Sequence, residues 1–348
     1  MSNLLKRCGF VLGFIASLQL PAFGSSDLQR ISTRAHNLLC TGQYQSAIQT
    51  LNTGIAQHPK VAELYSARAS CYSVLGKHAE ALKDINRAIG LEPRNALYYG
   101  NRASLLFANG KIEQAILDYD KAIKMKPEWA PGRYYSRGNA ILALKGKDSG
   151  DLLPDFNNAL KISANYYSIN AAMSRGDYFN SYLFRAKYHH FKVNYKAAIS
   201  DYKSALSLEP KSAEALVGLG FCCLHEKNYE SALSSFTRAI DIAPKTSNYA
   251  QLAFAGRAEA SLALSHVDIA KVDVDRCDVA HPQTSYVSAR LMNAAGDKDA
   301  ALEQYPRFVA AARSMLLKNE RSHNWYDIEL EERIKTATSE IELNGEKK

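Results

Sequence analysis

The sequence lacks the patterns that commit a chain to catalysis or to cofactor chemistry. It has no Gly-rich phosphate loop and no dinucleotide-binding turn, either of which would cradle a nucleotide with backbone amides. Its six cysteines include no C-x-x-C pair, the spacing used in redox and zinc sites. Its nine histidines include no two at the helical spacing of a zinc ligand pair. We therefore predict no metal, no cofactor and no enzyme activity.

Runs of like charge are also absent. The 43 Lys and Arg exceed the 35 Asp and Glu by only eight, and no block of five or six like charges occurs. The densest basic segment, 185–196, contains Tyr188 and Phe191, as a surface that stacks bases and binds phosphates would. On a helix these side chains spread around all faces, so we expect no nucleic acid partner.

Long hydrophobic runs are missing except at the start of the chain. Twelve almost wholly apolar residues, 9–20, follow two basic residues and end at Pro21. Ala22 and Gly24 occupy the two small-residue positions that a signal peptidase reads. The run is shorter than the ~20 residues that cross a bilayer. We predict a signal peptide at 1–24, a periplasmic or secreted protein, and no integral membrane span after cleavage; the alternative is a membrane tether by the uncleaved signal.

An odd number of cysteines remains after removal of the signal. In an exported protein this argues against a complete disulfide framework, and we expect mostly buried thiols. These residues are Cys40, Cys71, Cys222, Cys223 and Cys277.

A period of 34 residues runs through the rest of the chain. Pro59, Pro93 and Pro127 are 34 residues apart, and so are Pro210 and Pro244. Each period contains two helical segments of apolar periodicity, with Gly or Asn in the turn between them and the proline after the second. Small and aromatic residues recur at fixed places in every period. Examples are Gly76, Ala81, Ile85 and Ala88; Gly110, Ala115, Tyr119 and Ala122; and Asn194, Ala198, Tyr202 and Ala205.

This pattern resembles the tetratricopeptide repeat, whose signature combines aromatic, small and proline positions over 34 residues. The resemblance implies an all-α fold, a right-handed superhelical solenoid of antiparallel helix pairs. Regular repeats are predicted at 28–61, 62–95, 96–129, 179–212 and 213–246, and degenerate ones at 130–166, 251–284 and 285–318. Residues 167–178 are expected to form a loop between two arrays, and 319–348 a helix that caps the last repeat, followed by a tail.

Arginine recurs in the first helices and aspartate in the second helices. The arginines suggest a ladder for anions, but ion pairs that connect neighbouring repeats explain both sets of residues. We therefore expect structural pairs. The residues are Arg68, Arg102, Arg137 and Arg185, with Asp84, Asp118 and Asp201.

The resemblance also implies that the first helices line a concave groove in which a partner peptide docks. The groove positions are mostly polar in the first two repeats and turn apolar and aromatic from the third to the sixth, which suits an apolar or amphipathic peptide. The candidate groove residues are Leu97, Phe107, Tyr135, Asn139, Leu142, Leu183, Lys187, His190, Phe191, Phe221, Leu224 and His225. The Lys and Asn clamp that binds chaperone tails in this family is missing: its positions hold Ser32, His36, Ala67, Leu97 and Asn101.

We therefore expect a non-enzymatic exported scaffold or adaptor that binds an unidentified protein or peptide, in assembly or stabilisation of a protein complex. Two alternatives stay open. The apolar strip could be filled by the 165–178 insertion or by the C-terminal helix. The chain could instead be a small-ligand or metal-binding protein or an enzyme, with a site near 165–192, where His189 and His190 are adjacent.

Overall fold

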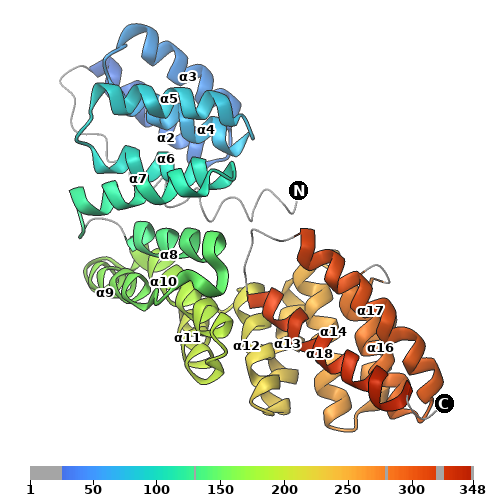
Figure 1. The fold of residues 1–348 in the computed structure, drawn as a ribbon. Helices are drawn as coiled ribbons and strands as arrows, with labels where there is room; N and C mark the ends of the chain where they lie inside the picture. The colour runs from blue at the N-terminus through green and yellow to red at the C-terminus, as the bar shows by residue number, and fades with distance from the viewer. Residues whose placement is uncertain (1–25, 129–130, 279–280, 319–324, 346–348) are drawn as a thin grey trace. The chain divides into compact units, whose positions relative to one another are not determined.

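The computed structural model describes residues 26–128, 131–278, 281–318 and 325–345, and all regular structure within them is helical. The chain divides into two compact units, with the division inside one helix, between Asp177 and Tyr178 (Figure 1). The predicted signal peptide lies outside the described residues. The prediction of an all-α solenoid of helix pairs is confirmed.

The first unit contains four helix pairs, in which consecutive helices pack against each other. A 3-10 helix, η1, follows the first helix of the fourth pair. The elements are α2 (Ser26–Cys40), α3 (Tyr44–Gln57), α4 (Ala62–Val74), α5 (His78–Leu91), α6 (Ala96–Ala108), α7 (Ile112–Met125), α8 (Pro131–Lys145), η1 (Gly146–Ser149) and α9 (Leu153–Ile169).

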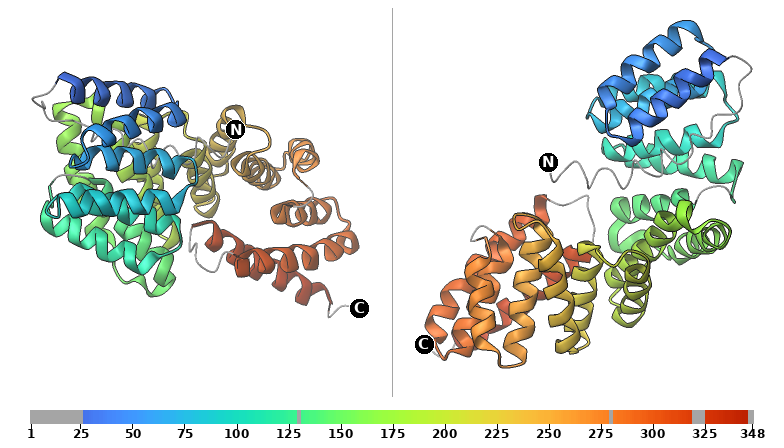
Figure 2. Two further views of the ribbon diagram at one scale, coloured as in Figure 1. Left: turned by 90° about the horizontal axis from the view of Figure 1, so that it is seen from above. Right: turned by 180° about the vertical axis from the view of Figure 1, so that it is seen from behind.

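The second unit continues the same arrangement and adds a final unpaired helix (Figure 2). Helix α10 (Ala171–Phe191) contains the division between the units. It is followed by α11 (Tyr195–Leu208), α12 (Ala213–His225), α13 (Tyr229–Ile242), α14 (Asn248–Ala263), α15 (Val267–Arg276), α16 (Pro282–Ala294), α17 (Lys298–Lys318) and α18 (Trp325–Gly345).

Small residues set how closely the helices of a pair approach. A Cβ on Gly218 would lie 2.4 Å from the Tyr202 ring, and a Cβ on Gly220 would lie 2.6 Å from the Phe236 ring. Helix α12 therefore packs its backbone directly on aromatic rings of α11 and α13, which a larger residue would prevent.

The turns inside the pairs use two kinds of residue. In the first three repeats, Gly42, Gly76 and Gly110 adopt positive φ after the first helix, which costs glycine little. In later repeats the positive φ falls on Val193 and Lys227. The asparagines that follow, which we expected to form the turn, are N-caps: the Asn194 side chain accepts from the Ala197 N–H, and the Asn228 side chain from the Ser231 N–H.

The expected Arg–Asp pairs exist, but their bidentate bonds lie within one repeat; an Arg–Asp pair between neighbouring repeats is made by Arg137, through its remaining nitrogen, with Asp120. Arg68 of α4 donates through Nε and Nη2 to both carboxylate oxygens of Asp84 of α5, each at 2.7 Å. Its third nitrogen, Nη1, donates to Asn52 Oδ1 of the preceding repeat at 2.7 Å. The same bidentate pair joins Arg102 to Asp118, Arg137 to Asp155, Arg185 to Asp201 and Arg257 to Asp273. The link between repeats is thus made by the remaining guanidinium nitrogen.

The expected loop at 167–178 is wrong. Helix α9 continues to Ile169, α10 begins at Ala171, and only Asn170 between them leaves helical geometry. The fourth repeat has no proline after its second helix, and nothing in Ala171–Asp177 breaks a helix except Gly176. Except for Asn170, the residues that we expected to form a loop therefore belong to α9 and α10.

We predict that Asp84→Ala lowers the free energy of unfolding by about 2–4 kcal/mol, because it leaves the largely buried Arg68 guanidinium without its carboxylate. The measurement is chemical denaturation of the purified protein. The matched control is Asp27→Ala, which removes an exposed pair with Arg30 and should cost less than about 1 kcal/mol. Equal effects of the two changes would contradict a structural role for the buried pair.

Candidate partner-binding faces

The predicted groove residues lie on first helices of the repeats, but in two separate sets. We call the side formed by α2, α4, α6 and α8 the N-terminal face, and the side formed by α10, α12, α14 and α16 the C-terminal face. Leu97, Phe107, Tyr135, Asn139 and Leu142 belong to the N-terminal face. The other seven candidates belong to the C-terminal face: Leu183, Lys187, His190, Phe191, Phe221, Leu224 and His225.

The C-terminal face is occupied by the chain's own last helix. Helix α18 lies across α12, α14 and α16 in Figure 1, and these helices stand in front of it in the view from behind in Figure 2. Glu329 of α18 is fully buried and accepts hydrogen bonds from two candidate groove residues. His190 Nε2 lies 2.8 Å and His225 Nε2 lies 2.9 Å from Glu329 Oε1.

Arg333, one turn further along α18, connects the helix to the seventh repeat. Its Nη2 donates to Glu259 Oε2 of α14 at 2.7 Å, and its Nη1 to Glu329 Oε2. Glu259 also accepts from Arg290 of α16, at 2.9 Å. The Arg333 guanidinium lies 5.0 Å from the Phe221 ring centre, within the range of a cation–π contact. Two arginines and two glutamates thus form one network across the docked helix.

This network keeps both glutamates ionised although they are buried. Burial raises the pKa of Glu329, but the charge of Arg333 and the hydrogen bonds from His190 and His225 hold it well below the ordinary value of 4.5. Burial likewise raises the pKa of Glu259, and the charges of Arg333 and Arg290 lower it below that value. Arg333 of α18 thus lowers the pKa of one carboxylate on its own helix, Glu329, and of one on α14, Glu259.

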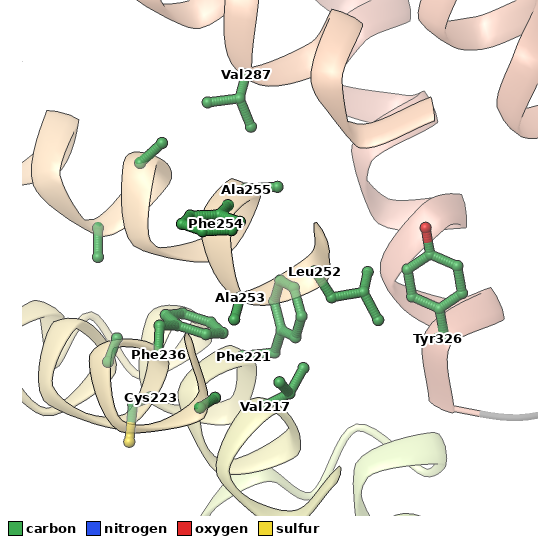
Figure 3. Packing of buried hydrophobic residues seen from close by; sticks show 14 of the residues in the cluster. Val217, Phe221, Cys223, Phe236, Leu252, Ala253, Phe254, Ala255, Val287 and Tyr326 are labelled. Atoms are coloured by element: carbon green, nitrogen blue, oxygen red, sulfur yellow. The ribbon is translucent and has the colours of Figure 1, made fainter. Parts of the chain in front are cut away.

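Apolar contacts complete the docking of α18. Tyr326, Leu330 and Ala337 belong to the buried core of the second unit, together with Phe221 and Leu252. In the close view, Leu252 lies between the ring of Tyr326 of α18 and the ring of Phe221 (Figure 3). The helix therefore contributes to the core of the unit over several repeats, whereas the sequence predicted only a cap on the last one.

The predicted open strip in the second unit is therefore wrong for its central residues. Phe221 is 1% exposed and His190 is fully buried, so neither can contact a partner while α18 is docked. Lys187 pairs with Glu214 at 2.9 Å, and Leu183 and Phe191 are buried. Leu224 is half-buried. The sequence left open whether the apolar strip is filled by the 165–178 insertion or by the C-terminal helix; in this unit the C-terminal helix fills it.

The N-terminal face differs because it has no such occupant among the described residues. Every helix from α2 to α9 belongs to a repeat pair, so none of them is left to lie across the face. Leu97, Phe107 and Asn139 are half-buried there, while Leu142 is buried. Tyr135 is buried and hydrogen-bonded to Asp177 at the start of α10.

Family models of the tetratricopeptide repeat match residues 33–96, 72–130 and 194–253. These parts of the chain are tetratricopeptide repeats. The matched segments include parts of both units, and the signature residues at these positions form the buried helix contacts described above.

Solved structures support the same fold. The APC/C hetero-tetramer Cut9–Hcn1 gives a TM-score of 0.56 at 15% identity, over 96% of this chain and 59% of that chain. The chain thus spans 59% of that protein's length, and the likeness shows the fold alone. The chain is also similar to a tetratricopeptide repeat protein from Parabacteroides merdae, with 17% identity and a TM-score of 0.35 over 90% of this chain and 100% of that one. Another similar structure is YrrB, described as a protein with an unusual peptide-binding site, with 18% identity and a TM-score of 0.38 over 58% of this chain and 95% of that one. No curated protein sequence matches the chain.

The adjacent histidines and the cysteines of the described residues do not form a metal or redox site. His189 lies 3.9 Å from Asp201, whereas His190 points to Glu329, so the adjacent histidines do not share a ligand. Within the described ranges, no three His, Cys, Asp or Glu side chains gather as a metal site, and no helix is long and apolar enough to span a bilayer. All five cysteines of the described part are free thiols, and burial raises the pKa of Cys71 to about 12.

The residues that hold α18 were not among the sequence candidates. Glu259 and Arg290 occupy first helices of degenerate repeats, where the signature is weak. In α18 itself, Tyr326, Glu329 and Arg333 recur every three or four residues and so share one helix face. That spacing was a readable signal of a docked face.

We predict that Arg333→Met releases α18, because Glu259 and Glu329 would stay buried without their shared cation, at a cost of roughly 3–5 kcal/mol. Hydrogen exchange of peptides within 325–345 should rise strongly, while exchange in α2 to α9 stays unchanged. The control is Lys335→Met on the exposed side of the same helix, which should leave exchange as in the wild type. Protection of α18 in the Arg333→Met protein would show that the network does not hold the helix.

Proposed function

We propose that this protein is an exported, non-enzymatic scaffold that docks a polypeptide on its N-terminal face, while α18 closes the C-terminal face. The observation that carries the proposal is the contrast between the two faces. The C-terminal face is covered by a helix of the same chain, whereas among the described residues the N-terminal face has no comparable helix.

The docked α18 supports the proposal as an example within the same chain. It shows the kind of segment that a face of first helices takes: an amphipathic helix with aromatic and aliphatic anchors and a few buried polar groups. On the N-terminal face, the apolar anchors of a partner would meet Leu97 and Phe107, which remain half-buried, with the Asn139 amide beside Leu142. Binding there would contribute to assembly or stabilisation of a protein complex.

Export is proposed from the first 24 residues. Their basic start, short apolar run and small residues at the cleavage positions suit a cleaved signal, and a periplasmic or secreted scaffold would meet its partner outside the cytoplasm. A tether formed by the uncleaved segment is the alternative outcome.

We expect the double change Leu97→Ala and Phe107→Ala to reduce partner capture about tenfold, because shortening two apolar anchors removes on the order of 1–2 kcal/mol of binding free energy. The measurement is a crosslinking pulldown from the protein's own compartment, with a photoreactive residue at position 139. The control is Leu117→Ala, an exposed leucine of α7 outside the face. Circular dichroism shows whether each variant is folded.

The wild-type protein must capture a defined polypeptide for the proposal to stand. Capture of none, or equal capture by the double variant and by Leu117→Ala, would contradict docking on the N-terminal face.

We expect the secreted form to begin at or near Ser25, because the small residues before it mark the cleavage site. Intact-mass measurement and N-terminal sequencing of protein expressed with its leader check this. Replacing Ala22 and Gly24 with large residues should retain the leader, and an unprocessed wild-type protein in the membrane fraction would support the tether.

A further inference from the structure

Arg133 is a buried cation for which the described residues supply no carboxylate partner. It lies in the first turn of α8 and is 6% exposed. Within the described part of the chain, its Nη1 atom has no hydrogen-bond partner. Arg137, one turn later on the same helix, is held by two carboxylates, Asp155 and Asp120. Arg133 therefore lacks the kind of carboxylate partner that Arg137 has.

Two electrostatic effects act against the charge of Arg133. Burial lowers its pKa to about 10, with only a small opposing effect from Tyr166. The first turn of a helix carries a positive partial charge, and α8 has no acidic residue there to offset it. An anion beside Arg133 would relieve both effects.

The repeat register shows which carboxylate is missing. Glu63, in the second repeat, acts electrostatically on Tyr98 of the next repeat, and Glu214, in the sixth, is hydrogen-bonded to Tyr249 of the next. Leu97 holds the equivalent position in the third repeat, 34 residues after Glu63. In the fourth repeat, Arg133 corresponds to Tyr98 of the third. The residue of the preceding repeat that would face it is therefore Leu97, which is apolar.

The side chain of Arg133 lies on the N-terminal face. A Cβ built on Gly100 would be 3.0 Å from Arg133 Nε and 3.5 Å from Cδ, so the absence of a side chain at Gly100 makes room for it. Gly100 repeats the position of Ser66 and Ser32, which the tetratricopeptide resemblance implies is a groove position. The buried guanidinium therefore lies against α6, at the side of that helix on which the proposed partner would dock.

The C-terminal face shows that a docked helix can bring a carboxylate to buried polar groups of a face. There, Glu329 of α18 lies within hydrogen-bond distance of His190 and His225 of the face, and Arg333 of α18 donates to Glu259 of the face. The N-terminal face has the arginine but lacks the carboxylate.

We propose that the polypeptide docked on the N-terminal face inserts an acidic side chain, Asp or Glu, against Arg133. This inference rests on the proposed docking function. It adds that the partner carries a negative charge at the position that contacts Arg133. Without a partner, Arg133 remains an uncompensated buried charge.

The first test uses small anions as probes on the purified mature protein. Glutarate at about 100 mM should raise the Tm by about 2 °C relative to chloride of equal ionic strength, since a ligand that binds only the folded state stabilises it. Arg133→Met should remove this response and leave the ligand-free Tm equal to or above that of the wild type. The control is Arg94→Gln, an exposed arginine of the same unit, which should keep the response.

A second variant supplies the missing group within the chain. Leu97→Glu restores the carboxylate found in the second and sixth repeats, and should raise the ligand-free Tm and abolish the glutarate response. The inference is overturned if glutarate acts no differently from chloride, if phosphate alone stabilises the protein, or if Arg133→Met responds like the wild type.

The pulldown separates this inference from the proposed function. Loss of capture in Arg133→Met, with capture kept in Arg94→Gln, supports both. Capture that is unchanged in Arg133→Met overturns the acidic contact and leaves docking intact. A glutarate response that depends on Arg133, without capture of any polypeptide, overturns docking and leaves an anion site.

Discussion

The Arg–Asp ion pair that joins the two helices of five repeats, the second to the fifth and the seventh, is the contact on which the rest of the array depends. Its two parallel hydrogen bonds fix how the second helix lies against the first, and the third guanidinium nitrogen reaches the preceding repeat. Because the pair recurs in both units, the first helices that carry it, α4, α6, α8, α10 and α14, are held against their second helices in the same way, with the opposite side left to form a face. Partly buried ion pairs of this kind fix geometry more than they add stability.

Sequence reasoning succeeded where the contacts repeat along the chain. The prolines, small residues and aromatics recur every 34 residues because every repeat makes the same local contacts. It failed on the direction of the Arg–Asp pairs, although a signal was present: Arg68 and Asp84 are equally far from Gly76, as are Arg102 and Asp118 from Gly110. In an antiparallel pair, residues equidistant from the turn lie side by side, so the pair had to fall within one repeat.

The occupied face could not be predicted in the same way, because its contacts are distant in sequence and occur once. His190 and Glu329 are separated by 139 residues, and His225 and Glu329 by 104. No period relates them, and Glu259 and Arg290 lie in repeats whose signature has decayed. The sequence also could not predict that Arg133 lacks a carboxylate partner. That conclusion needs two facts together, the burial of Arg133 and the apolar residue Leu97 at the position where other repeats have a glutamate.

The buried charges also explain why the two faces suit different tasks. A helix that replaced α18 would need a carboxylate and a guanidinium one turn apart, because without the carboxylate His190 and His225 would lose their hydrogen-bond partner, and without the guanidinium Glu259 would keep only its pair with Arg290. It would also compete with a segment of the same chain, whose effective concentration through a short linker is on the order of millimolar. Both requirements weigh against a second segment on the C-terminal face while α18 is docked. Among the described residues the N-terminal face has no tethered competitor, so a partner there need only outweigh its own ordering entropy and can use the charge of Arg133 for selection.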